Sequence, residues 1–169
     1  MKQFILLFIA GLLFAASPTA IGQGKKPASP PAKAQGVIDG VSITIDYSQP
    51  SVRGRKVMGD LVPYGKVWRT GANATTSIEF SADVVIGGKK VSKGKYGLYT
   101  IPGESEWTLI VNKAIKWGSD DYKESDDLAR AKAKSSKTEF VETFTISIEK
   151  DQIILRWENT QVGFTVKKG

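Results

Sequence analysis

The sequence contains no cysteine and no histidine among its 169 residues. Without cysteine the chain has no disulfide, no thiolate nucleophile and no cysteine-ligated metal. Without histidine it lacks the Ser-His-Asp and Cys-His arrangements of nucleophilic catalysis, and the commonest ligand for zinc, copper and non-haem iron. Catalysis by lysine, tyrosine or paired carboxylates stays open. The composition therefore favours a protein without catalytic residues, without a metal site and without a cofactor.

The charge is modestly basic, with 24 lysines and arginines against 17 acidic residues and a net charge of +7. The lysines are scattered along the chain, whereas nucleic-acid binding proteins usually concentrate their basic residues in one patch or stripe. We therefore expect no nucleic-acid partner. The charge supports solubility and a mild attraction to anionic surfaces or glycans.

Residues 1–22 have the pattern of a secretory signal peptide. Lys2 provides a positive charge, residues 4–16 form an unbroken apolar run, and Ala20-Ile21-Gly22 offers small residues for cleavage before Gln23. The run is short for a membrane span, so we expect no membrane-spanning segment after cleavage. The expected location is exported, either periplasmic or extracellular.

The rest of the chain divides into an arm and one β-rich domain. Residues 23–36 are rich in proline and glycine without periodicity, and predict a flexible or extended N-terminal arm. From residue 37 to 169 apolar and polar residues alternate in short runs, which is typical of half-buried strands. Gly87-Gly88 lies between two such runs and predicts a tight hairpin turn.

About eight to ten short strands with regular turn signals predict an all-β fold, a single-domain antiparallel β-sandwich of jelly-roll-like type. The segment 113–134 is the least clear. Its first part reads as a polar loop, while residues 128–134 alternate between alanine and longer side chains. That alternation fits a strand or a short helix, and we favour the strand.

The segment 47–76 breaks the alternation and is the candidate functional segment. Long loops on a rigid β scaffold often carry function. Arginine offers a planar donor fork for carboxylate or phosphate, and tryptophan and tyrosine pack on sugar rings or cations. The segment predicts a pocket for a carbohydrate or an anionic small molecule, and its candidate ligand-binding residues are Arg53, Arg55, Tyr64, Trp68, Arg69 and Asn73.

Structural roles for these residues are the alternative interpretation. Trp68 can belong to the core, and Arg69 can pair with a carboxylate such as Glu79 or Asp46. Two further tryptophans, Trp107 and Trp157, lie in phase with apolar strand faces and are expected in the core.

Two other parts of the sequence contain residues that could form a site. Trp117 precedes a glycine in the polar loop and is expected to be exposed. The acidic residues between 120 and 127 do not have the spacing of a calcium-binding loop. The acidic residues therefore do not predict a metal site, whereas Trp117 is a candidate contact for carbohydrate.

Three functional hypotheses follow. The first is a non-enzymatic binding or envelope-associated module that takes a sugar-like or anionic ligand in the segment 47–76. The second is a hydrolase that uses two carboxylates, with Glu79 and Glu158 among the candidates, and it requires those groups to share one cleft. The third is a structural or protein-interaction domain, which an exposed apolar patch or a bare edge strand would favour.

The residues also resemble a known family. The stretches that carry the resemblance are YSQPSVRGR (47–55), LVPYGKVWRTGAN (61–73), GKYGLYTIPG (94–103) and Glu106-Trp107. They are similar to the Domain of Unknown Function 2911 family, exported proteins found mostly in Bacteroidetes and related bacteria. The resemblance covers about residues 37–167. It implies an exported, β-rich single domain and assigns no catalytic residue.

Overall fold

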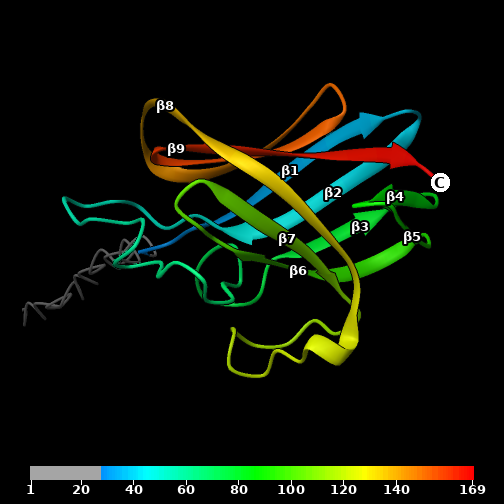
Figure 1. Ribbon diagram of the computed structural model, residues 1–169, viewed down its shortest axis with the longest axis horizontal. Coiled ribbons are helices and arrows are strands. Elements are labelled where there is room, and N and C mark those ends of the chain that lie inside the picture. Colours follow the sequence, from blue (N-terminus) through cyan, green and yellow to red (C-terminus); the bar gives the residue numbers. More distant parts are fainter. Residues whose placement is uncertain (1–27) are drawn as a thin grey trace, which may run out of the picture.

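The computed structural model describes residues 28–169, so the predicted signal peptide (1–22) and the first part of the predicted arm lie outside the described residues. Residues 28–169 form nine strands and one short 3-10 turn, η1 (Glu124–Asp126) (Figure 1). No helix within residues 28–169 is long and apolar enough to cross a membrane. The strands are β1 (Pro31–Ile38), β2 (Val41–Ser48), β3 (Ser77–Phe80), β4 (Val84–Ile86), β5 (Lys89–Val91), β6 (Gly94–Ile101), β7 (Glu106–Asn112), β8 (Asp127–Glu149) and β9 (Gln152–Lys168).

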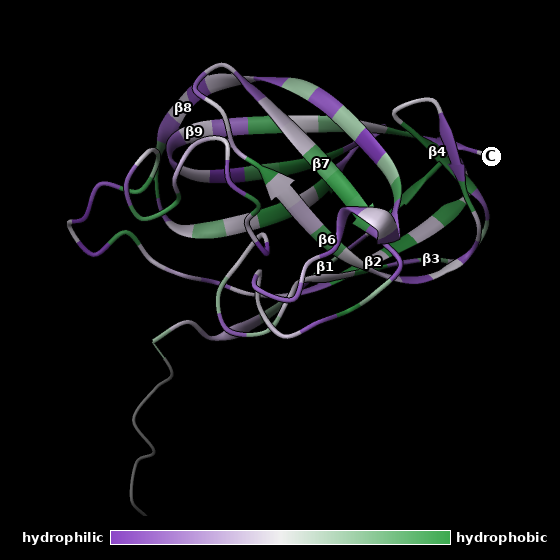
Figure 2. Cartoon of the chain, turned by 60° about the horizontal axis from the view of Figure 1, so that its bottom comes forward, coloured by the Kyte–Doolittle hydropathy of each residue, from purple (hydrophilic) through white to green (hydrophobic). Residues whose placement is uncertain are grey.

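The alternation of apolar and polar residues explains why these segments are strands. In β2 every second side chain is buried, from Val41 to Tyr47, while those between them face outward. Figure 2 shows the same alternation as hydrophilic and hydrophobic bands along the strands. The Gly87-Gly88 turn joins β4 to β5, with both glycines at positive φ. The predicted all-β antiparallel fold is confirmed.

All nine strands belong to one hydrogen-bonded sheet in the order β1-β2-β3-β6-β7-β8-β9-β4-β5. The long strand β8 lets this sheet fold over on itself. Its first part pairs with β7 and its second part pairs with β9, and the register shifts at Lys137/Val141 and Val141/Thr145 mark irregular pairing with β9. Figure 1 shows β8 arching over the molecule, so the two layers of the domain are continuous through this strand.

The folded sheet brings its first strand back against the end of β8. Gly36 on β1 lies so near Ile148 on β8 that a Cβ atom at position 36 would come within 2.7 Å of the isoleucine side chain. A glycine is therefore required here by the close approach of two strands that are not neighbours in the sheet. This contact holds the two layers together at one end of the domain.

The structure corrects the predicted arm. Residues 31–36 pair with β2 and form the first six of the eight residues of β1. The sequence did not indicate this strand, because proline and alanine are uncommon in strands. β1 lies at the end of the strand order, and proline is tolerated at the first position of such a strand.

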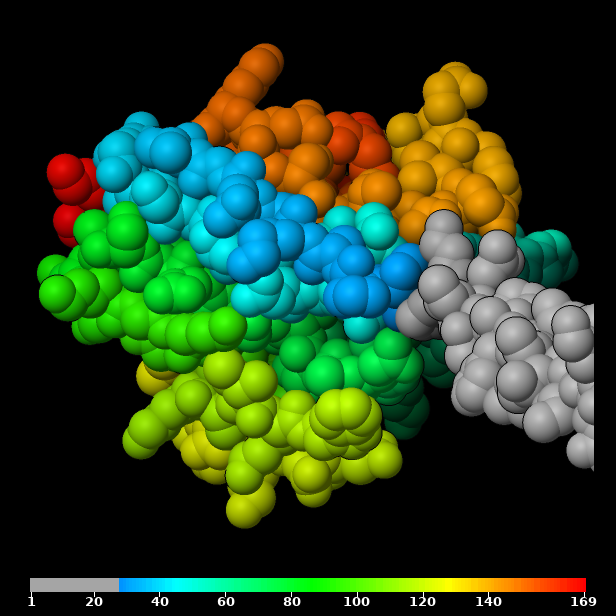
Figure 3. Space-filling view, turned by 180° about the vertical axis from the view of Figure 1, so that it is seen from behind, coloured from blue at the N-terminus to red at the C-terminus, as the bar shows by residue number. Residues whose placement is uncertain are grey.

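The undecided segment is now assigned. The favoured strand is confirmed, since residues 128–134 belong to β8, with Ala129 and Ala131 buried and Arg130, Lys132 and Lys134 exposed. The preceding residues, 113–123, form a loop that protrudes from the body of the domain (Figure 3, yellow-green).

Candidate functional site

The segment between β2 and β3 crosses one end of the folded sheet. Near its start it is tied to β8, because the backbone N–H of Val52 donates to the carbonyl of Glu142 and Pro50 accepts from Phe144. Further on it is tied to β6, where Trp68 and Thr100 exchange two backbone hydrogen bonds of 2.8 and 2.9 Å. The segment is irregular but anchored at both ends, so its side chains have defined positions.

Three of the six candidate residues line one cavity of about 230 Å³, which we call the arginine cavity. These are Arg55, Trp68 and Arg69, and Trp157 of β9 completes the aromatic part of the wall. The other lining residues are Ser29, Pro50, Leu61, Val62, Gly71 and Ala72. None of the described residues that line it is a carboxylate.

Arg69 is the most unusual residue of the arginine cavity. It is half-buried, and within residues 28–169 its Nε atom is closed to solvent and has no hydrogen-bond acceptor. The expected alternative, an ion pair with Asp46 or Glu79, is not what the described residues show. Asp46 pairs with Lys33 at 2.8 Å and with Lys95 at 3.1 Å, and Glu79 faces solvent on β3. The hydrogen bond from Lys33 is the main reason that the pKa of Asp46 lies below its ordinary value.

Arg55 is exposed and is held by the backbone of its own loop. Its Nε donates to the carbonyl of Val52 at 3.1 Å and its Nη2 to the carbonyl of Ser51 at 2.8 Å. Neutral carbonyl groups orient the guanidinium without cancelling its charge. The arginine cavity thus contains two positive side chains whose charge is not balanced by any carboxylate in its described lining.

Trp68 is also part of the core, as the alternative interpretation expected. Its ring stacks on Trp157 and meets the edges of Trp107 and Phe144. Its indole N–H donates to the carbonyl of Gly71 at 3.0 Å. The tryptophan therefore shapes the floor of the cavity, while its own donor is already used. Trp107 and Trp157 are buried, as predicted.

Arg53 and Asn73 are not among the residues that line the arginine cavity. Arg53 donates from Nη2 to the carbonyl of Ala28 at 2.6 Å, and Asn73 donates from Nδ2 to the carbonyl of Ser29 at 3.2 Å. Both residues have positive φ, 51° and 59°, in the left-handed region. They fix residues 28 and 29, so that Ser29 lies at the wall of the cavity.

Tyr64 is separated from the arginines and lines a second cavity of about 280 Å³, which we call the tyrosine cavity. A tight turn built on the Met58–Val62 bridge contributes to both cavities, with Val62 on the arginine side and Met58 on the tyrosine side. Glu158 of β9 holds this turn, since its two carboxylate oxygens accept from the backbone N–H groups of Val57 and Met58. The sequence gives no signal for this role, because the two segments are a hundred residues apart.

The other candidates do not form a site within residues 28–169. Glu79 and Glu158 are on strands that are not neighbours in the sheet, and neither lines the two cavities. No group of three or more acidic residues in the described part of the chain is arranged to hold a metal ion. Trp117 is 73% exposed in the loop 113–123, as predicted.

Comparison with known proteins gives a family match whose limits lie within two residues of the first and last strands. No curated protein and no solved structure matches the chain. One family, described as "Protein of unknown function (DUF2911)", matches residues 29–166 and so spans all the strands from β1 to the end of the core. Its lower limit, residue 29, lies two residues before β1 rather than at residue 37. The chain therefore belongs to the DUF2911 family.

Proposed function

We propose that this protein is a non-enzymatic binding module and that it takes a small anionic ligand in the arginine cavity. The proposal rests on Arg69, whose half-buried guanidinium has no carboxylate partner within residues 28–169. Buried or half-buried arginines are ordinarily paired, because an uncompensated charge in a low-dielectric setting is costly. An anion in the cavity would provide the missing partner.

The chemistry of the lining favours a carboxylate or phosphate over other groups. Arginine presents a planar fork that matches the oxygens of these anions, and such charge-assisted hydrogen bonds are the stronger ones. Arg55 adds a second positive charge at the same cavity, and the tryptophan rings add an apolar wall. A volume of about 230 Å³ is below the roughly 300–1,000 Å³ of pockets for drug-sized ligands, so the ligand is a small one.

Binding is favoured over turnover by the groups that line the cavity. The two-carboxylate hydrolase needs a pair of carboxylates flanking the ligand. The described lining of the arginine cavity contains none, and Glu158 is engaged with the backbone of the neighbouring turn. The interaction-domain hypothesis has exposed apolar residues such as Ile115 and Trp117 in the loop 113–123 and Phe140 on β8, but none of these three lines either cavity.

The place of action belongs to the same proposal. We infer export to the periplasm or beyond the cell from the signal-like residues 1–22. In that setting a small anion, either a free metabolite or the acidic group of an envelope polymer, is the available ligand class. The scattered lysines give no reason to expect nucleic acid.

The test is isothermal titration of the chain from Gln23 with citrate, phosphate, glucose 6-phosphate and galacturonate. Arg69→Gln is the diagnostic variant, and Lys66→Gln is the matched control because it removes one positive charge from an exposed position of the same segment that lines neither cavity. We expect at least one anion to bind, about tenfold or more weaker to Arg69→Gln, since a hydrogen bond to a charged group contributes about 1.5–3 kcal/mol. Lys66→Gln should bind nearly as the wild type.

The proposal is wrong if none of the four anions binds to the folded wild-type protein. It is also wrong if Arg69→Gln, shown to be folded by circular dichroism, binds as tightly as the wild type.

A further inference from the structure

The tyrosine cavity has a lining that differs in kind from that of the arginine cavity. Its wall is built from the turn at Met58, the turn that joins β6 to β7, the middle of β8 and the middle of β9. The side chains that matter are Tyr64, Glu104, Trp107, Lys137 and Asn159, and the hydroxyl groups of Ser135, Ser136 and Thr160 accompany them. Donors and acceptors of hydrogen bonds are therefore mixed around one small volume.

Trp107 is the buried polar group of this cavity. Its side chain is only 2% exposed, and within residues 28–169 its Nε1 atom is closed to solvent and has no acceptor. The three other tryptophans do not share this state: Trp68 and Trp157 each donate to a backbone carbonyl, and Trp117 faces solvent. A buried donor left without an acceptor costs about 1–3 kcal/mol. A ligand oxygen that enters the cavity and reaches the indole after a small shift of the wall removes that cost.

The charges around the tyrosine cavity are balanced rather than positive. The lining holds one carboxylate, Glu104, and burial is the main cause that raises the pKa of the Tyr64 hydroxyl, with smaller contributions from Glu104 and Glu158. Lys137 supplies the opposite sign at the same cavity. An anion finds no excess of positive charge here, in contrast to the arginine cavity.

Several polar groups of the lining have unused capacity. Asn159 donates one long hydrogen bond of 3.4 Å to the carbonyl of Thr138, and Ser135 donates one of 3.3 Å to the carbonyl of Glu104. An amide has two donors and an acceptor, and a hydroxyl can both donate and accept. Each can therefore contact a ligand without giving up its present partner.

We propose that the tyrosine cavity is a second binding site, specific for an uncharged, hydroxyl-rich group such as a sugar ring. Sugar hydroxyls both donate and accept, so they match a lining that contains a carboxylate, an amide, hydroxyls and an ammonium group. The rings of Trp107 and Tyr64 supply apolar surface beside these groups. The site is separate from the arginine cavity, and its occupation does not depend on the anion.

The indole N–H signals in a ¹H–¹⁵N spectrum test this site, because the chain has only four tryptophans and each reports on a different place. The probes are glucose, galactose, mannose and N-acetylglucosamine, each added to about 50 mM, well above a millimolar Kd. Trp107→Phe and Trp117→Phe identify their signals by loss. We expect the Trp107 signal to move with at least one sugar while the Trp117 signal stays.

Two variants and two controls locate the binding. Tyr64→Phe and Glu104→Gln should each weaken sugar binding about tenfold or more, because the first removes a hydroxyl from the lining and the second replaces a charged acceptor by a neutral amide. Tyr96→Phe makes the same chemical change outside the cavity, where the hydroxyl donates to the carbonyl of Ser92, and should leave the affinity unchanged. Arg69→Gln should also leave it unchanged, which separates this site from the proposed anion site.

The proposal is overturned if no sugar moves the Trp107 signal, or if only the Trp117 signal moves. It is equally overturned if phosphate or citrate moves the Trp107 signal of Arg69→Gln and the sugars do not. Failure of the anion titration with success of the sugar titration would leave this site standing and remove the other.

Discussion

Trp68 stacks on Trp157 with ring centroids 5.9 Å apart and ring planes 17° from parallel. The first residue belongs to the irregular segment and the second to β9, so this pair joins the segment to the sheet. Both rings line the arginine cavity. One contact therefore serves stability and shapes the candidate site.

Replacement of Trp68 by alanine should destabilise the protein by about 3 kcal/mol, through lost contacts with three aromatic neighbours. Urea denaturation monitored by circular dichroism measures the change. Trp117→Ala is the matched control, since its ring is exposed, and should stay within about 0.5 kcal/mol of the wild type. Equal effects of the two substitutions would show that Trp68 is not part of the core.

Gly36→Ala should destabilise the protein by about 1–3 kcal/mol, because the new Cβ would overlap the Ile148 side chain. Ile148→Ala makes room for it. In the double variant the two changes should be less than additive by at least about 0.5 kcal/mol, as expected for residues in contact. Strict additivity in a double-mutant cycle would contradict the close packing of β1 on β8.

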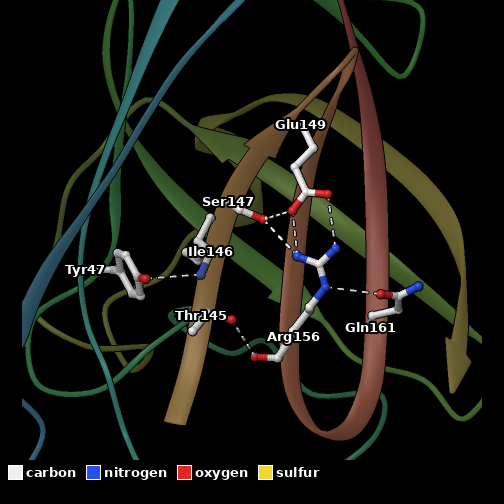
Figure 4. Close-up of polar contacts among 7 residues, drawn as sticks. All are labelled: Tyr47, Thr145, Ile146, Ser147, Glu149, Arg156 and Gln161. Atoms are coloured by element: carbon white, nitrogen blue, oxygen red, sulfur yellow. Dashed lines mark hydrogen bonds and ion pairs between the residues drawn. The ribbon is translucent and has the colours of Figure 1, made fainter. Parts of the chain in front are cut away.

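Glu149 and Arg156 form the pH-sensitive pair of the β8–β9 hairpin (Figure 4). Arg156 donates from both Nη atoms to the carboxylate and Ser147 donates a third hydrogen bond, so the pKa of Glu149 falls from 4.5 to about 2. A lowered pKa contributes stability above pH 4.5 that is lost as the pH falls toward 2. The pair is partly exposed, so we expect a contribution below about 1 kcal/mol.

NMR titration of the Glu149 carboxyl carbon measures this pKa directly. Arg156→Gln removes the guanidinium that lowers the pKa of Glu149 most, so this pKa should return most of the way toward 4.5. Gln161 accepts from Arg156 Nε without carrying a charge, so Gln161→Ala serves as the control and should shift the pKa far less. An unshifted pKa in Arg156→Gln would mean that the pair does not form in solution.

Glu158→Ala should loosen the turn at Met58 and weaken binding at both cavities by a few-fold. The carboxylate accepts two long hydrogen bonds, of 3.4 and 3.3 Å, from the backbone of that turn. Glu79→Ala removes an exposed carboxylate elsewhere and is the control. Hydrogen–deuterium exchange at Val57 and Met58 reports the loosening, and unchanged protection there would rule it out.

The sequence predicts which segments form strands better than it predicts which strands pair with one another. Period-two alternation identifies a buried face in β2 and in the second half of β8, and the Gly87-Gly88 turn marks its hairpin. It does not reveal that β8 continues through 23 residues and pairs with two different strands. Nor does it identify β1, whose small residues suit a strand that packs closely on another layer.

The sequence predicted one pocket in the segment 47–76, whereas four of its six candidate residues are divided between two cavities. Arg55, Trp68 and Arg69 line the arginine cavity. Tyr64 lines the tyrosine cavity, because the five-residue turn Met58–Val62 separates the two. Sequence distance within an irregular loop does not determine which side of a turn a residue occupies. Trp157 and Glu158 come from β9, and only the three-dimensional fold brings them to this segment.

The Arg69 guanidinium can report directly whether an anion binds in the arginine cavity. Its Nε–H signal can be identified in a ¹H–¹⁵N spectrum by comparison with Arg69→Lys, and followed while citrate and phosphate are added. We expect a signal in the free protein that moves with saturation as an anion binds, because the group lacks an acceptor within residues 28–169. A signal that stays fixed with both anions, at the position of a carboxylate-bonded arginine, would contradict the account.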